Sequence, residues 1–258
     1  MSNRRDVYIV DGSRTPQLKA RGRPGPFSAS DLAVSAGRAL MTRHDFDLGE
    51  LDEVIVGCVM PSEDEANIGR VIALRLGVPQ TVPAWTVQRN CASGMQSIDS
   101  AFQNIANGQS DLVLAGGVEA MSRAPLLYNS KMVHWMSDLM QAKTVGQKLK
   151  TFAQFRPGLL KPVIALLRGL TDPVVGLNMG QTAENIAANF GITRKQMDSF
   201  AVASHQRLAA ALEAGYLDEI EPVYDASGKF YDHDDGMRAD SSVEKLAKLR
   251  PVFDRNYG

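Results

Sequence analysis

Apolar residues in the first half of the chain follow two alternating patterns. Continuous apolar runs of strand length occur at residues 7–10, 54–59, 82–87 and 112–115. Apolar residues at helical spacing lie between these runs, at residues 30–41, 67–76 and 92–106. Ser30 is the expected N-cap of the first of these helices. The alternation predicts an α/β fold, in which a mostly parallel sheet is flanked by helices on both faces.

The second half of the chain has a different pattern. Residues 118–175 carry no strand signal, and helical spacing returns at residues 179–190 and 193–214, each ended by a glycine. A short strand is expected at residues 220–223, a hairpin turn at 225–228, and a short helix at 241–249. The pattern predicts a sheet domain over residues 1–120 and a largely helical domain over residues 121–258.

Composition narrows the class of protein. The 258 residues are 44% hydrophobic and 22% charged with a net charge of −1, which is typical of a globular protein and gives no indication of nucleic-acid binding. The chain has no signal-peptide pattern and no apolar run of membrane-spanning length, so we expect a cytoplasmic protein. Neither Cys58 nor Cys91 lies in a Cys-x-x-Cys pair, so no metal site is expected.

Cys91 is the candidate nucleophile. It lies between the predicted strand at 82–87 and the predicted helix at 92–106, where the free backbone N–H groups and the dipole of a helix favour a thiolate. Small residues follow it, so a bulky thioester could approach. The alternative is a buried structural cysteine. That interpretation is favoured for Cys58, which lies inside an apolar strand.

Six segments resemble those of thiolases, in the same order along the chain. The nucleophile segment, residues 88–98, contains Asn-Cys-Ala-Ser-Gly around Cys91. The other five are residues 9–16, 67–70, 115–122, 179–185 and 246–253. The resemblance implies a layered thiolase-like fold whose N-terminal half-domain is followed by a helical loop domain that contacts coenzyme A (CoA).

The resemblance also implies a reaction, the exchange of acyl groups between CoA thioesters. In the degradative direction Cys91 would attack the 3-keto carbon of a 3-ketoacyl-CoA, release acetyl-CoA, and pass the shortened acyl group to free CoA. The reverse direction condenses two acetyl-CoA molecules. CoA is then a substrate, and no covalently bound cofactor is implied.

Several family features have no counterpart in this sequence. The family's Asn-containing loop, His-containing loop and second catalytic cysteine, in a Cys-x-Gly motif, are not found, and none of the four histidines has the family's context. The final strand of the first half-domain and the whole C-terminal half-domain are also missing. We therefore expect the sequence to be the front part of a thiolase, inactive by itself.

The predicted CoA contacts follow from the resemblance position by position. They are Leu170, Met179, Arg238 and Phe253. Arg238 would pair with the nucleotide phosphate or stack near the adenine. Core packing is the alternative role for Leu170 and Met179. Many relatives have a serine where this chain has Lys245, which leaves that contact open.

A basic segment interrupts the second half. Residues 139–171 contain six Lys or Arg residues and no Asp or Glu, interleaved with large apolar residues. A solvated amphipathic face is one interpretation, and contact with phosphate groups or a membrane surface is the other. The segment is similar to one in thiolase subunits of fatty-acid β-oxidation complexes, which implies a β-oxidation partner subunit and longer ketoacyl substrates. Thiolases are oligomers, so we expect a homodimer or tetramer, with residues 82–87 as a candidate contact.

Two alternatives to a thiolase stay open at this point. Another condensing enzyme of the same fold, such as a ketoacyl synthase, also uses a cysteine at a strand–helix junction, although residues 179–185 and the surroundings of Arg238 argue against it. A non-catalytic fragment with a role in assembly would leave Cys91 inert.

Overall fold

The computed structural model describes residues 4–256 and 258, and the chain divides into two compact units. The first unit joins Met1–Arg123 to Ala187–Gly258, and the second is Ala124–Ile186. Residues 121–258, predicted as one domain, are therefore shared between the two units.

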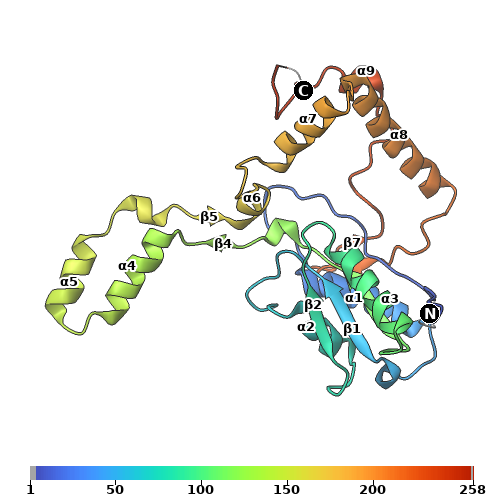
Figure 1. Ribbon diagram of the computed structural model, residues 1–258, viewed down its shortest axis with the longest axis horizontal. Helices are drawn as coiled ribbons and strands as arrows, with labels where there is room; N and C mark the ends of the chain where they lie inside the picture. Colours follow the sequence, from blue (N-terminus) through green and yellow to red (C-terminus); the bar gives the residue numbers. More distant parts are fainter. Residues whose placement is uncertain (1–3, 257) are drawn as a thin grey trace. The chain divides into compact units, whose positions relative to one another are not determined.

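A three-stranded parallel sheet forms the centre of the first unit (Figure 1). Its strands are β1 (Glu53–Gly57), β2 (Ala84–Val87) and β3 (Val113–Gly117), in the order β2-β1-β3. Every residue of the central strand β1 is buried, which explains its continuous apolar run. The predicted parallel α/β architecture is confirmed.

Three helices accompany this sheet: α1 (Ala29–Thr42), α2 (Ile68–Leu76) and α3 (Ser93–Ala106). α2 connects β1 to β2, whereas α3 connects β2 to β3 on the other side of β1. Right-handed crossovers in these opposite directions place α2 and α3 on opposite faces of the sheet. α1 packs against α2. The expected N-cap Ser30 lies inside α1, because Ser28 forms the capping box with Asp31.

Residues 7–10 are not a strand, contrary to the prediction. Tyr8, Ile9 and Val10 are more than three-quarters exposed, and no other described segment forms backbone hydrogen bonds with them. A β-branched and aromatic run provides strand propensity, but a strand also requires a neighbouring backbone to pair with. That neighbour is absent from the described residues.

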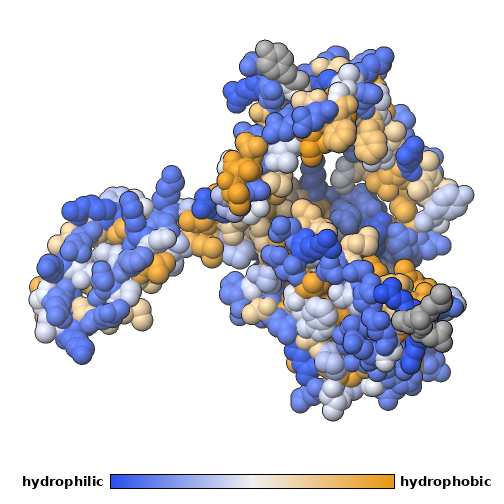
Figure 2. Space-filling view, in the orientation of Figure 1, coloured by the Kyte–Doolittle hydropathy of each residue, from blue (hydrophilic) through white to orange (hydrophobic). Residues whose placement is uncertain are grey.

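The second unit contains a helical hairpin, α4 (Ser130–Gln141) and α5 (Val145–Ala153), mounted on a two-stranded ribbon. The ribbon pairs β4 (Leu126–Leu127) with β5 (Val163–Ile164), and α6 (Ala165–Gly169) follows. The expectation of no strand in residues 118–175 is wrong, because two-residue strands leave no periodic signal. Figure 2 shows apolar surface over this ribbon.

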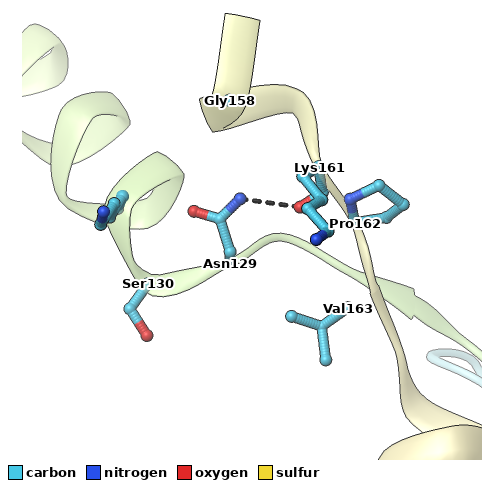
Figure 3. A pocket seen from close by; sticks show the side chains of 7 residues that line it. Asn129, Ser130, Gly158, Lys161, Pro162 and Val163 are labelled. Atoms are coloured by element: carbon cyan, nitrogen blue, oxygen red, sulfur yellow. Dashed lines mark hydrogen bonds between the residues drawn. The ribbon is translucent and has the colours of Figure 1, made fainter. Parts of the chain in front are cut away.

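Asn129 closes the base of the hairpin, beside a cavity of about 400 Å³ (Figure 3). Its side-chain amide donates hydrogen bonds to the carbonyls of Leu159, at 2.9 Å, and Lys161, at 2.7 Å. Its side-chain oxygen accepts from the Met132 amide, at 3.0 Å, and so caps α4. One side chain therefore fixes both ends of the hairpin.

The later helices are α7 (Met179–Asn189), α8 (Arg194–Glu213) and α9 (Val243–Leu246), close to their predicted ranges. The strand expected at residues 220–223 is displaced: β6 (Val223–Tyr224) pairs with β7 (Phe230–Tyr231). The hairpin turn at residues 225–228 is confirmed, since the Gly228 amide donates to the Asp225 carbonyl.

Within residues 4–256 and 258, no helix is long and apolar enough to cross a membrane.

Candidate active site

The candidate nucleophile Cys91 lies exposed on a tight turn between β2 and α3. Asn90 adopts a left-handed conformation with φ of 47°, which asparagine tolerates better than most residues. Ser93 closes the turn from inside: its hydroxyl accepts from the Arg89 amide at 2.8 Å and donates to the Asn90 carbonyl at 2.7 Å. The turn thus presents the Cys91 side chain to solvent on a constrained backbone.

Three glycines allow the start of α3 to lie directly on the sheet. A Cβ atom on Gly57 of β1 would come within 2.3 Å of the Ser93 carbonyl group, and one on Gly117 of β3 within 2.7 Å of the Gly94 Cα. The Ser97 hydroxyl adds a bond across this contact, donating to the carbonyls of Gly94 and Gly116, both at 2.7 Å. Backbone therefore packs on backbone beneath the turn.

The first turn of α3 offers donors for an anion. The amides of Gly94 and Met95 have no acceptor among the described residues, as expected at a helix N-terminus. These groups and the helix dipole favour negative charge beside Cys91. A thiolate, or the oxyanion formed when it attacks a carbonyl, is the kind of species that such donors stabilise.

Cys58 has the opposite environment. It is buried at the end of β1, and its thiol lies 3.7 Å from a carboxylate oxygen of Glu119. Burial, reinforced by the negative charge of Glu119, raises the pKa of Cys58 to about 12. Glu119 itself accepts hydrogen bonds from the amides of Val59 and Met60. Cys58 is therefore a structural residue, as its sequence context suggested.

Two of the four predicted CoA contacts, Leu170 and Met179, are brought together in the second unit. The Met179 amide donates to the Leu170 carbonyl at 2.9 Å, and a bridge between Thr171 and Asn178 reinforces the pair. Leu170 is the C-cap of α6 and Met179 begins α7. Met179 is 43% exposed, so part of its side chain is free to contact a ligand.

The other two predicted contacts, Arg238 and Phe253, belong to the first unit. Arg238 is exposed, and its backbone amide donates to the His205 ring at 3.2 Å, which ties its loop to α8. His205 thus has a structural role in the described chain. The Lys245 ammonium group, whose contact with CoA the sequence left open, donates to the Asp240 carboxylate. Phe253 is half exposed.

Sequence reasoning missed how the nucleophile turn is built. Ser93 and Ser97 were noted only as part of a motif, although their hydroxyls hold the turn and the helix in place. A serine in the first turn of a helix is a known competitor for backbone hydrogen bonds, and this signal could have identified Ser93. The glycine contacts left no such signal, because they join β1, α3 and β3 across long sequence separations.

No acid or base among the described residues is hydrogen-bonded to Cys91: no histidine or carboxylate of the described chain forms a hydrogen bond with its thiol. No cluster of three or more His, Cys, Asp or Glu residues able to hold a metal occurs within residues 4–256 and 258. The site thus consists of a thiol and backbone donors.

Comparison with protein families adds an independent finding. The family model described as "Thiolase, N-terminal domain" matches residues 7–258. Among curated proteins, the chain is 35% identical to the mitochondrial trifunctional enzyme subunit beta of Bos taurus and 38% identical to the beta-ketoadipyl-CoA thiolase of Pseudomonas knackmussii. These alignments cover 99% and 96% of this chain but only 53% and 60% of the relatives.

Solved structures agree with the sequence comparison. The acetyl-CoA acetyltransferase of Bacillus anthracis aligns with a TM-score of 0.82 at 32% identity, covering 100% of this chain and 61% of that one. Human mitochondrial 3-ketoacyl-CoA thiolase in complex with CoA aligns with a TM-score of 0.78, also at 32% identity, over 95% of this chain and 58% of that one. The chain thus spans between about half and three-fifths of the length of these relatives.

Proposed function

Since the chain belongs to the thiolase family, through the family's N-terminal domain, we propose that it provides the acyl-carrying cysteine for transfer between CoA thioesters. The observation that supports this most directly is the position of Cys91, exposed beside the unpaired amides of Gly94 and Met95. The family match favours a thiolase over a ketoacyl synthase.

The proposed chemistry has two steps. The Cys91 thiolate attacks the 3-keto carbon of a 3-ketoacyl-CoA, and the resulting oxyanion accepts hydrogen bonds from backbone amides. The C2–C3 bond then breaks, its electron pair takes up a proton, and acetyl-CoA leaves. The thiol of free CoA next loses its proton, which balances the proton taken up by acetyl-CoA, and its sulfur attacks the acyl-Cys91 thioester, so that the Cys91 thiolate leaves. The reverse sequence condenses acetyl-CoA.

We further propose that this chain by itself accepts an acyl group but turns over slowly. Both steps require proton transfer, and no described acid or base is hydrogen-bonded to Cys91. A second polypeptide segment is needed to provide these groups. Met95, Ile98 and Phe102 lie at helical spacing along α3 and are 70%, 42% and 42% exposed, which supports the presence of a covering segment.

For CoA, we propose contacts with the four residues that the family resemblance indicates, Leu170, Met179, Arg238 and Phe253. The exposed guanidinium of Arg238 suits a phosphate, and the exposed ring of Phe253 suits the adenine. The likeness to a CoA-bound thiolase supports this assignment. We propose no cofactor other than CoA, which is a substrate.

The proposed partners are a second copy of the chain and a β-oxidation subunit. β2 is an edge strand of the sheet, with Trp85 36% exposed, so it can pair or pack with another molecule. The likeness to a trifunctional enzyme subunit supports a partner in β-oxidation.

We propose the cytoplasm as the location, since both cysteines are free thiols.

Intact-mass analysis after incubation with acetyl-CoA tests the proposal. We expect an acetyl adduct on the chain that is retained in Cys58→Ala and lost in Cys91→Ala. Thiolysis of acetoacetyl-CoA by the same preparation should be far below the turnover of a whole thiolase. An adduct that persists in Cys91→Ala would refute the assignment of the nucleophile, and rapid thiolysis would refute the need for a second segment.

A further inference from the structure

The loop over residues 232–241 is bonded at its start to the N-terminal segment of the chain. The Asp234 carboxylate accepts a hydrogen bond from the Gln17 amide at 2.7 Å, and the Asp235 carboxylate accepts one from the Lys19 amide at 2.5 Å. The Gln17 carbonyl accepts in return from the Asp235 amide at 3.2 Å. These bonds join residues more than 200 positions apart, so tertiary structure fixes the start of the loop.

Arg238, further along this loop, has both of its backbone polar groups bonded. Its amide donates to the ring nitrogen Nδ1 of His205 at 3.2 Å, and its carbonyl accepts from the Ser241 amide at 3.1 Å. A carbonyl that is bonded to the amide three residues later closes a β-turn, and Ser241 is buried. The two bonds therefore fix the point at which the Arg238 side chain leaves the backbone.

The Arg238 guanidinium itself is exposed and forms no hydrogen bond with a described residue. The carboxylate nearest to it in the sequence, Asp240, is bonded by Lys245, whose ammonium group donates to the Asp240 carbonyl at 2.7 Å and to its carboxylate at 2.5 Å. A guanidinium is always charged and presents a planar fork of donors that matches the oxygens of a phosphate. Arg238 thus combines a fixed backbone with a side chain that is free to bind an anion.

The helix α8 supports this part of the chain at two places. His205 lies in its interior, and a ring whose Nδ1 accepts a hydrogen bond is the neutral tautomer with its proton on Nε2. At the start of α8, the Arg194 guanidinium donates to the carbonyls of Leu246, at 2.7 Å, and Leu249, at 3.1 Å. A single helix therefore holds the chain on both sides of the turn that begins at Arg238.

We propose that His205 is a positioning residue for CoA. It does not touch the ligand, but it holds the Arg238 amide so that the guanidinium is already in place for a phosphate of the CoA nucleotide. A loop that is ordered before binding loses less conformational entropy on binding, so the ligand binds more tightly. The inference rests on the proposed contact between Arg238 and CoA, and it does not involve the Cys91 thiol.

Calorimetric titration of the whole chain with CoA, in the presence of a reductant, tests the role of His205. His205→Leu removes the acceptor and should weaken CoA binding about tenfold. His205→Asn should restore binding to within about twofold, because the oxygen of asparagine is bonded to Cγ as Nδ1 is, and the two residues have similar helix propensity. His205→Gln carries its oxygen one bond further out and should bind as weakly as His205→Leu.

A double-mutant cycle separates positioning from a general loss of structure. Arg238→Ala should weaken CoA binding about tenfold or more, since it removes the charged donor to the phosphate. In that background, His205→Leu should cause less than about a further twofold loss, because His205 acts through Arg238. A merely structural role for His205 would make the two losses additive.

Gln206→Leu is the matched control. It introduces the same residue at the next position of α8, where the side chain is exposed, and we expect less than about a twofold change in affinity. Circular dichroism verifies that each variant is folded. The inference is wrong if His205→Asn binds as weakly as His205→Leu, if the losses of His205→Leu and Arg238→Ala add, or if the chain does not bind CoA. Binding of CoA without acetylation of Cys91 would refute the chemistry proposed for Cys91 and leave the role of His205 standing.

Discussion

Cys58 and Cys91 lie at neighbouring strand ends, yet one is buried against a carboxylate and the other is exposed beside free amides. Only the thiolate form of cysteine is a strong nucleophile, so the environment of each thiol determines its reactivity. The pKa of about 12 at Cys58 leaves almost no thiolate there near neutral pH. The two residues therefore differ in chemistry as well as in position.

This contrast predicts selective modification of the two thiols. At pH 8, iodoacetamide should label Cys91 and leave Cys58 unmodified in the folded chain, as determined by peptide mass mapping. Both should react in denaturant, where burial and Glu119 no longer act on Cys58. Equal labelling of both residues in the folded chain would contradict the environment described for Cys58.

Gly57 provides a second prediction at the scale of a residue. Gly57→Ala adds a Cβ atom 2.3 Å from backbone atoms of Ser93, and neither strand nor helix can yield without losing other contacts. We expect a loss of about 1–3 kcal/mol in the free energy of unfolding, measured by urea denaturation, and weaker acylation of Cys91. Gly116→Ala is the control, because nothing lies within 4 Å of its added Cβ and it should be nearly neutral.

Elements differ in how well the sequence predicted them. β1, α2 and α3 were predicted within one or two residues, because β1 buries a continuous apolar run and each helix packs one face against the sheet. β4 and β5 were not predicted, since two-residue strands depend on pairing over about 37 positions of sequence. Residues 7–10 were predicted as a strand from local propensity alone, but their pairing partner is not among the described residues.

The candidate site was predicted in the same uneven way. Cys91 was predicted as the candidate nucleophile because a strand, a cysteine and a helix follow one another directly in the sequence, and that role stays a prediction. The glycine packing beneath Cys91 was not predicted, because Gly57, Gly94 and Gly117 come from three elements and meet only after folding. Local order in the sequence predicts the candidate nucleophile, whereas the packing that holds Cys91 depends on the tertiary structure.

The α4–α5 hairpin allows a prediction at the scale of an element. Asn129→Ala removes the cap of α4 and both bonds to the returning chain, so hydrogen exchange should rise throughout residues 130–161. Asn129→Asp keeps the capping oxygen but loses the donors to Leu159 and Lys161. We expect exchange in Asn129→Asp to rise at residues 159–161 with α4 largely protected. If hydrogen exchange rises equally across residues 130–161 in both variants, the Asn129 oxygen and amide group do not have these separate roles.

Across the first unit, Arg14 ties the N-terminal segment to a region more than 200 residues away. Its guanidinium bonds both carboxylate oxygens of Asp234, at 2.8 and 3.0 Å, and Glu219 at 3.1 Å. The Asp234 side chain is only 12% exposed. The Arg14 guanidinium holds the pKa of Asp234 below its ordinary value of 3.8.

This ion pair predicts how the stability of the molecule depends on pH. A carboxylate with a lowered pKa in the folded state contributes stability above the unfolded pKa, near 3.8, and loses it as pH falls through the lower folded pKa. In Asp234→Asn, the free energy of unfolding should be lower at pH 7 and should fall less steeply between about pH 5 and 2. Denaturation curves across that range measure both effects, and an unchanged slope would exclude Asp234 as a contributor.

The backbone contact among Gly57, Gly94 and Gly117 also limits how this site can be redesigned. A designer who grafts the Asn-Cys-Ala-Ser-Gly turn onto another parallel sheet would transfer the cysteine without the strand glycines. Because those glycines have no side chain, the start of the helix can pack directly on the strands. The recipient scaffold must have glycine on two adjacent strands as well as in the turn. Any method that ranks scaffolds by matching side chains alone would overlook that requirement.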